Sequence, residues 1–242
     1  MRVLLTLQYL GTRYAGWQAQ ENALSVQQVV EEALASLCKQ PVAVAGAGRT
    51  DAGVHAERQS AHFDLPLDIP IRGVVLGLND LLPRDVRVVA AGEVPPDFHA
   101  RFSAVSKTYR YQIWNDEIAD VFRAPTHALV RAPLELERMH AAAEPLVGRH
   151  DFRAYTVADP EVTSTVRTLE SLTIARDGAA ILVHVTADGF LRYMVRRIVG
   201  QLIEIGRGKL DVPAAAAALE PGFAQARWTA PPEGLVLESV RY

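Results

Sequence analysis

Apolar and polar residues alternate over residues 3–9, and this period of two predicts a half-buried β-strand. Its apolar face carries Val3, Leu5, Leu7 and Tyr9. A helical period of apolar residues follows Ser25, which forms a capping-box start with Gln28 three residues later. The chain is therefore predicted to open with a strand and a helix.

The same two periods continue through the rest of the first half. Strands are predicted at residues 42–47, 59–65 and 85–94, and a second helix at residues 69–83. The resulting order, β-α-β-β-α-β, is that of a ferredoxin-like unit.

The second half has this order again without a repeat in its sequence. Its strands are predicted at residues 107–116, 127–130, 165–176, 179–188 and 234–242, and its helices at residues 134–148 and 190–208. Asp177-Gly178 is predicted to close a hairpin between two of these strands. We therefore predict an α+β fold of two ferredoxin-like (RRM-like) halves, residues 1–104 and 105–242. Their sheets can join into one mixed, mostly antiparallel platform.

The composition also bears on where the protein is located. No segment reaches the roughly 18 apolar residues of a membrane helix, and polar residues interrupt the apolar N-terminus. Cys38 is the only cysteine, so an intramolecular disulfide and a cysteine zinc cluster are excluded. Its place in a helical apolar pattern predicts a buried thiol. We expect a cytoplasmic protein that does not associate with membranes.

Charge gives a weaker indication of the partner. The formal net charge is -3, yet 22 of the 25 basic residues are arginines, because the only lysines are Lys39, Lys107 and Lys209. The planar guanidinium suits contacts with phosphates and bases. A compositional bias of the genome explains the count alone more simply.

The most unusual stretch is the glycine-rich segment GAGRTDAGVHA at residues 46–56. Two interpretations of Asp51 are open: an aspartate that bonds its own backbone in a turn, or a carboxylate offered as nucleophile or base. In the second interpretation Arg49 binds phosphate or holds a displaced base, and Gly46, Gly48 and Gly53 give another molecule room. His55 has a spacing from Asp51 that suits a metal on a helix, but the predicted loop supplies no third ligand.

Two segments gather positive charge. Residues 98–114 have a local charge of +3 and five interleaved aromatic residues, a pattern typical of surfaces that stack nucleobases. Residues 190–209 have a local charge of +4 on a predicted amphipathic helix that includes Arg192, Arg196 and Arg197. The alternatives are that the aromatic residues form core and the arginines are solvated. A net acidic chain with two such segments has a polarised surface, and RNA rather than DNA is the natural partner.

These motifs together resemble the bacterial tRNA pseudouridine synthase A family. The resemblance is carried by GTRYAGWQAQ, GRTDAGVHA, FHARFSAVSKTYRY, VGRHDF, MVRRIVGQL and GLVLESVRY, in the family's order from about residue 3 to the C-terminus. It implies two ferredoxin-like halves with a central basic cleft between them. It also implies a homodimer that isomerises uridines 38 to 40 of the tRNA anticodon stem-loop without metal or organic cofactor.

The resemblance also implies roles for individual residues. Asp51 corresponds to the nucleophilic aspartate, Tyr109 to the tyrosine that stacks on the target uracil, and Arg196 to the arginine paired with the aspartate. Arg49 corresponds to the arginine that helps to extrude the base, and Leu235 to an apolar residue near the site.

The chain departs from the family pattern in a few positions. Leu10 replaces an aspartate, Arg197 replaces an asparagine, and Asp188 with Arg192-Tyr193 replaces an asparagine-glycine pattern and a tyrosine-histidine pair. These departures put local loop contacts in doubt and remove no matched catalytic group.

Three hypotheses follow for the function. An aspartate synthase attacks either uracil C6 or ribose C1′, and the sequence leaves both routes open. A non-catalytic RNA-binding protein of paired RRM-like units explains the aromatic strand and the basic helix equally well, but leaves Asp51 unexplained. A metal-dependent nuclease using Asp51 and His55 is the weakest alternative.

Overall fold

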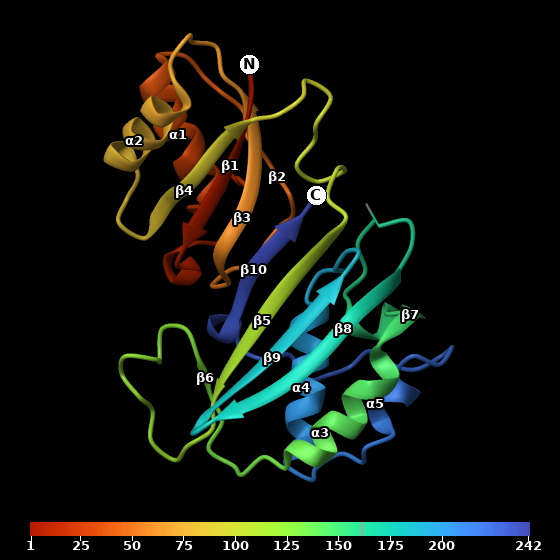
Figure 1. Ribbon diagram of the computed structural model, residues 1–242. Helices are drawn as coiled ribbons and strands as arrows, with labels where there is room; N and C mark the ends of the chain where they lie inside the picture. The colour runs from red at the N-terminus through yellow and green to blue at the C-terminus, as the bar shows by residue number, and fades with distance from the viewer. Residues whose placement is uncertain (161) are drawn as a thin grey trace. The chain divides into compact units, whose positions relative to one another are not determined.

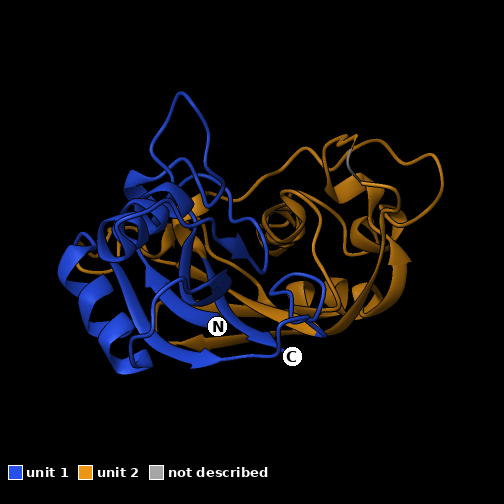
Figure 2. Ribbon diagram, turned by 90° about the horizontal axis from the view of Figure 1, so that it is seen from above, with its two compact units in different colours: residues 1–105, 236–242 blue, residues 106–235 orange. Residues whose placement is uncertain are grey.

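The protein is described by a computed structural model that covers residues 1–160 and 162–242. The chain forms two compact units, coloured separately in Figure 2. Unit 1 contains residues 1–105 and 236–242, and unit 2 contains residues 106–235. Each unit combines a sheet with helices, so the predicted α+β class is confirmed.

Unit 1 is a sheet with strand order β4-β1-β3-β10 and two helices (Figure 1). Its elements are β1 Arg2–Tyr9, α1 Val26–Cys38, β2 Ala45–Gly46, β3 His55–Asp64, α2 Ile71–Leu81, β4 Val86–Glu93 and β10 Leu235–Arg241. β1 is antiparallel to β3 and β4, whereas β10 is parallel to β3. Because β10 pairs with β3, residues 236–242 belong to unit 1, although the sequence order groups them with the second half.

The predicted strand at residues 3–9 and the helix after Ser25 are both present. The four residues of the apolar face of β1 are at most 2% exposed. Ser25 accepts a hydrogen bond from the backbone N–H of Gln28 at 3.2 Å. The Gln28 side chain donates to Glu32 instead of returning to Ser25, so only half of the capping box forms. Cys38 is buried as predicted.

The strand predicted at residues 42–47 is wrong in length, because β2 contains only two residues. The backbone of Val44 bonds to side chains of α1 and not to a strand: its N–H donates to Glu31 Oε1, and its carbonyl accepts from Gln27 Nε2, both at 3.0 Å. The next strand, β3, begins at His55 and so includes residues predicted as loop.

Unit 2 is a sheet with strand order β5-β9-β8-β7, with α3 and α4 on one of its faces (Figure 1). Its elements are β5 Ser106–Trp114, β6 Ala128–Leu129, α3 Leu136–Ala143, β7 Gly148–Asp151, β8 Val166–Asp177, β9 Ala180–Ala187, α4 Met194–Gly206 and α5 Ala214–Ala217. β8 and β9 form the predicted hairpin, and the residues between them are Gly178 and Ala179. Asp177 is thus the last residue of β8 and pairs with Ala180.

Two predicted helices of unit 2 differ from those observed. The helix at residues 134–148 ends at Ala143, a 3₁₀ turn containing Pro145 follows, and β7 was not predicted. The helix at residues 190–208 begins only at Met194. Its apolar residues have the predicted amphipathic period, but the helix has no solvated face, because all of its residues except Arg196 are buried. Among the described residues, no helix combines the length and apolar character needed to cross a bilayer.

Candidate active site

Asp51 and Arg49 lie in unit 1, on the loop between β2 and β3. Asp51 is half-buried and Arg49 is exposed, with Arg49 Nε donating to Gln18 Oε1 at 3.2 Å. The Asp51 carbonyl accepts from the Val54 N–H at 3.1 Å, which closes a tight turn. Gly53 is the third residue of this turn and has φ +79°, a conformation that glycine adopts at no steric cost.

Buried polar side chains of the sheet hold this loop. The Tyr9 hydroxyl on β1 hydrogen-bonds to Thr50 Oγ1 at 2.9 Å, and Gln59 Nε2 on β3 donates to the Gly48 carbonyl at 2.9 Å. Burial raises the pKa of Tyr9 to about 12, although hydrogen bonds to Thr50 and Gln59 act in the opposite direction. The phenol is therefore protonated at neutral pH and remains able to donate. The residues on both sides of Arg49 are fixed to the sheet.

The segment at residues 11–17 holds the same loop from its other side. The Trp17 N–H donates to the Thr50 carbonyl at 3.1 Å, and the Gly53 N–H donates to the Tyr14 carbonyl at 3.2 Å. Gly16 has φ +95°, and a Cβ there would lie 2.5 Å from the Thr50 carbonyl oxygen. This close backbone approach is therefore restricted to glycine, and it fixes the position of the peptide that precedes Asp51.

Two of the loop glycines have internal roles. A Cβ added at Gly46 would meet the Trp17 ring at 2.6 Å, and Gly53 supplies the positive φ of the turn. The sequence predicts that these glycines leave room for another molecule. The structure explains both of them by packing and backbone conformation.

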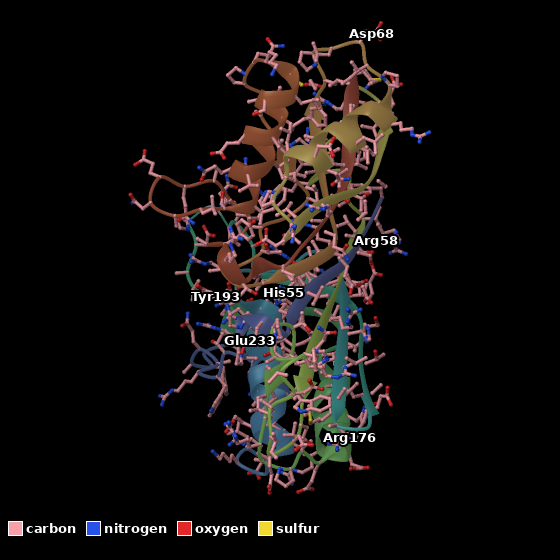
Figure 3. All side chains as sticks on the ribbon, turned by 90° about the vertical axis from the view of Figure 1, so that its left-hand side faces the viewer. His55, Arg58, Asp68, Arg176, Tyr193 and Glu233 are labelled. Carbon is pink, nitrogen blue, oxygen red and sulfur yellow. The ribbon has the colours of Figure 1, made fainter. Side chains whose placement is uncertain are left out.

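His55 is not on the loop as predicted, but is the buried first residue of β3 (labelled in Figure 3). Its Nδ1 accepts from the Gly11 N–H at 2.8 Å. That lone pair is therefore engaged within unit 1 and not directed to a metal. Within residues 1–160 and 162–242, no three His, Cys, Asp or Glu side chains are grouped in a way that would hold a metal ion.

Tyr109 lies on β5 of unit 2 and is 7% exposed. Its ring makes an edge contact with Phe190, with centroids 5.0 Å apart and planes at 84°. Tyr109 and Tyr111 share the buried face of β5, which agrees with the predicted alternation. An aromatic pair of this geometry is a stable packing unit.

Arg196 lies in the first turn of α4 and is the only residue of that helix that is not buried. Its Nε donates to the Ala230 carbonyl at 2.8 Å, and its own carbonyl accepts from the Ala230 N–H at 2.9 Å. The Arg196 guanidinium carbon also lies 5.3 Å from the centroid of the Tyr193 ring. Leu235, buried at 5% exposure, is the first residue of β10.

The structure thus places the predicted site residues in two groups. Arg49 and Asp51 share one loop of unit 1, whereas Tyr109 and Arg196 lie on β5 and α4 of unit 2. Leu235 is the last residue of unit 2, and the rest of its strand, β10, belongs to unit 1. The sequence interpretation missed the residues that support them, namely Tyr9, Thr50, Gln59 and Tyr193. Gln59 gave no clear signal either, because the predicted strand at residues 59–65 also contains the polar residues Ser60, His62 and Asp64.

The residues that depart from the family pattern lie in different environments. Leu10 is exposed, and Asp188 accepts the Thr168 N–H at 3.1 Å. Arg197 is buried and its Nη1 donates to the Thr156 carbonyl. Burial lowers the pKa of Arg197.

Comparisons with known proteins give a consistent result. The family model described as tRNA pseudouridine synthase matches residues 6–103 and 142–242. A protein of Myxococcus xanthus named tRNA pseudouridine synthase A is 46% identical over 100% of this chain and 92% of its own length. Proteins of the same name from Geobacter sulfurreducens and Pseudomonas aeruginosa are 46% and 40% identical, covering 99% and 100% of this chain and 99% and 85% of their own lengths.

Among solved structures, one chain of the archaeal box H/ACA sRNP Nop10-Cbf5 complex aligns with 84% of this chain and 44% of its own length. Its sequence identity is 10% and its TM-score is 0.37, which is below the similarity that identifies a common fold.

Proposed function

Because this chain belongs to the tRNA pseudouridine synthase family, we propose that Asp51 is the carboxylate with which it isomerises uridine to pseudouridine in tRNA. The observation that carries the proposal is the support of the Asp51 loop. Hydrogen bonds from β1, β3 and residues 11–17 fix the residues around Asp51, as preorganised catalysis requires.

The reaction needs a nucleophile and no change of oxidation state. The N1–C1′ bond breaks, the freed uracil rotates, and C5 bonds to C1′. The C5 proton is lost to solvent and N1 gains a proton, so atoms and electrons balance without a redox cofactor. A carboxylate assists by adding to uracil C6 or by capturing C1′, and each route needs Asp51 ionised.

Unit 2 supplies the remaining groups in this proposal. Arg196 pairs with the carboxylate and favours its ionised form. Tyr109 stacks on the target uracil, which offsets a few kcal/mol of unstacking by about 1–3 kcal/mol. Arg49 helps to extrude the base, and Leu235 packs near it. Both units therefore contribute to one reaction.

We extend the proposal to the features that the family resemblance implies. The substrate uridines are those at positions 38 to 40 of the anticodon stem-loop, and the enzyme acts as a cytoplasmic homodimer without metal or organic cofactor. Each unit is a ferredoxin-like half, and a basic cleft between the halves receives the RNA.

The test uses tRNA that carries tritium at uracil C5. We expect the protein to release tritium without added metal, and Asp51→Asn to lower the rate by more than about 10³-fold while still binding tRNA. Asp68→Asn is the matched control, because Asp68 is an exposed carboxylate elsewhere in unit 1 (labelled in Figure 3). A tRNA with cytidine at positions 38 to 40 tests the position and should release no tritium.

The outcomes separate the competing hypotheses. Binding without tritium release from any tRNA would establish the non-catalytic RNA-binding protein instead. Cleavage of the tRNA that is lost on chelation would favour the nuclease, and tritium release at the full rate by Asp51→Asn would remove Asp51 from the mechanism.

A further inference from the structure

Tyr193 has a backbone conformation that its residue type disfavours. It has φ +64° and ψ 0°, in the left-handed region where a bulky side chain is a rare outlier. Only one other non-glycine residue in the described part of the chain has a positive φ, namely Lys39. Lys39 follows the last residue of α1, where a left-handed residue commonly ends a helix. Tyr193 is at the opposite end of its helix, so this explanation does not apply to it.

The residue is also unsuited to its capping position. An N-cap residue normally has an extended backbone and a short polar side chain that accepts a helix N–H. Tyr193 is the N-cap of α4 and makes no side-chain cap hydrogen bond. Glycine or asparagine would suit the backbone better, and serine or aspartate would cap the helix. Strained residues of this kind persist only where the surrounding structure holds them in place, and they cluster at functional sites.

The Tyr193 ring instead contacts two guanidinium groups. The guanidinium carbons of Arg192 and Arg196 lie 5.1 Å and 5.3 Å from its centroid, distances typical of cation–π contacts. Arg192 is exposed, and its Nη2 approaches the Tyr193 hydroxyl at 3.4 Å. Figure 3 labels Tyr193 at the start of α4.

These contacts restrict the orientation of Arg196. The hydrogen bond from Nε to the Ala230 carbonyl fixes one point of the guanidinium. Contact with the Tyr193 ring restricts rotation of the guanidinium plane about that bond. The terminal nitrogens of Arg196 are therefore oriented, and a bidentate contact with a carboxylate depends on such orientation.

We propose that Tyr193 is a positioning residue that acts on the isomerisation through Arg196. The proposal rests on the role of Arg196 given under the proposed function. It explains why a tyrosine occupies a left-handed N-cap: the ring is needed beside Arg196, and the backbone adopts the conformation that delivers it there.

Three variants separate positioning from folding. Tyr193→Gly and Tyr193→Asn relieve the backbone strain but remove the ring, so we expect kcat for tritium release to fall about 10–100-fold with little change in KM. Their Tm should stay within about 3 °C of the wild type. Tyr193→Phe keeps the ring and should restore kcat to within about threefold.

Lys39→Gly is the matched control, because it relieves the same kind of backbone strain at an exposed position of unit 1. We expect a Tm rise of about 2–4 °C and unchanged kinetics. A double-mutant cycle with Arg196→Lys tests whether Tyr193 acts through Arg196. In the Arg196→Lys background, Tyr193→Gly should change kcat by less than about threefold.

Each other result overturns the proposal. Unchanged kcat in the Gly and Asn variants would show that the ring is dispensable, and a rise in KM alone would show an RNA contact. A kcat loss accompanied by a large fall in Tm would show a packing role, and full additivity with Arg196→Lys would show an independent action. Asp51→Asn measured in parallel tests the proposed function separately, because its result does not depend on Tyr193.

Discussion

The hydrogen bond between Tyr9 and Thr50 holds the Asp51 loop, and its contribution to the free energy of unfolding can be worked out directly from the structure. The two residues are 2% and 5% exposed, and their hydroxyl oxygens are 2.9 Å apart. The other partner of the Tyr9 hydroxyl is Gln59 Nε2 at 3.5 Å, an amide nitrogen that donates and cannot accept. Thr50→Val therefore leaves a buried phenol without an acceptor, which costs about 1–3 kcal/mol.

Tyr9→Phe leaves the Thr50 hydroxyl without its partner and should cost a similar amount. The double variant replaces both polar groups by apolar groups of nearly the same shape, so its cost should be smaller than the sum. We expect a coupling free energy of about 1–2 kcal/mol between the two positions.

Amide hydrogen exchange can measure the loss of stability in the Asp51 loop itself. The N–H groups of Trp17 and Gly53 donate to carbonyls across the loop, so their exchange reports its opening. In Thr50→Val these amides should exchange about 5–150-fold faster, corresponding to the loss of about 1–3 kcal/mol. The rate of tritium release should fall as well, because Asp51 follows Thr50 directly.

Additive effects of the two single changes would refute the reasoning. So would unchanged exchange at Trp17 and Gly53 in Thr50→Val. In either case the network would not be what holds the loop.

Two further predictions concern the same unit. Gly11→Ala should lower the free energy of unfolding by about 3 kcal/mol or more, because its Cβ would lie 1.9 Å from the Val54 carbonyl oxygen. The control Gly73→Ala, exposed in α2 with open space at the added Cβ, should gain about 1 kcal/mol, and equal urea midpoints for the two variants would contradict this contrast. The pKa of Tyr9 is raised from 10.0 to about 12 in the folded state, so this group contributes stability below pH 10 that is lost as pH rises toward 12. Between pH 9 and pH 11, urea unfolding should therefore show a larger loss of stability for the wild type than for Tyr9→Phe, by about 1 kcal/mol, and parallel losses would show that Tyr9 is not the group responsible.

The sequence by itself determined the elements whose cause is local. The alternation over residues 3–9 specifies β1, because a period of two indicates a strand with one buried face. Ser25 specifies the start of α1, because its side chain caps the helix. The family motifs likewise predict Asp51 as the reactive carboxylate, since a motif is a property of the sequence. In these cases neighbours in the chain supply the interactions that decide the outcome.

Only the tertiary structure decided features that depend on distant partners. Only two residues of the strand predicted at residues 42–47 form β2, because side chains of α1 hydrogen-bond to the backbone N–H and carbonyl of Val44. The Tyr9 hydroxyl bonds to two side chains that lie 41 and 50 residues further along the chain, those of Thr50 and Gln59. No local pattern in the sequence links residues so far apart. α4 contains Arg196, Arg197 and Glu204, yet all of its residues except Arg196 are buried because unit 2 surrounds it.

Tyr193 shows the same division most clearly. The sequence marks it only as a departure from a family pattern, and nothing in its neighbours predicts a left-handed backbone. Residue type sets the energetic cost of that conformation, whereas the contacts of Arg196 with Ala230 and with the ring decide where the side chain must lie. The sequence therefore determined which chemical groups the protein has, and the fold determined how they are held, because hydrogen bonds and ring contacts form between residues that only folding brings together.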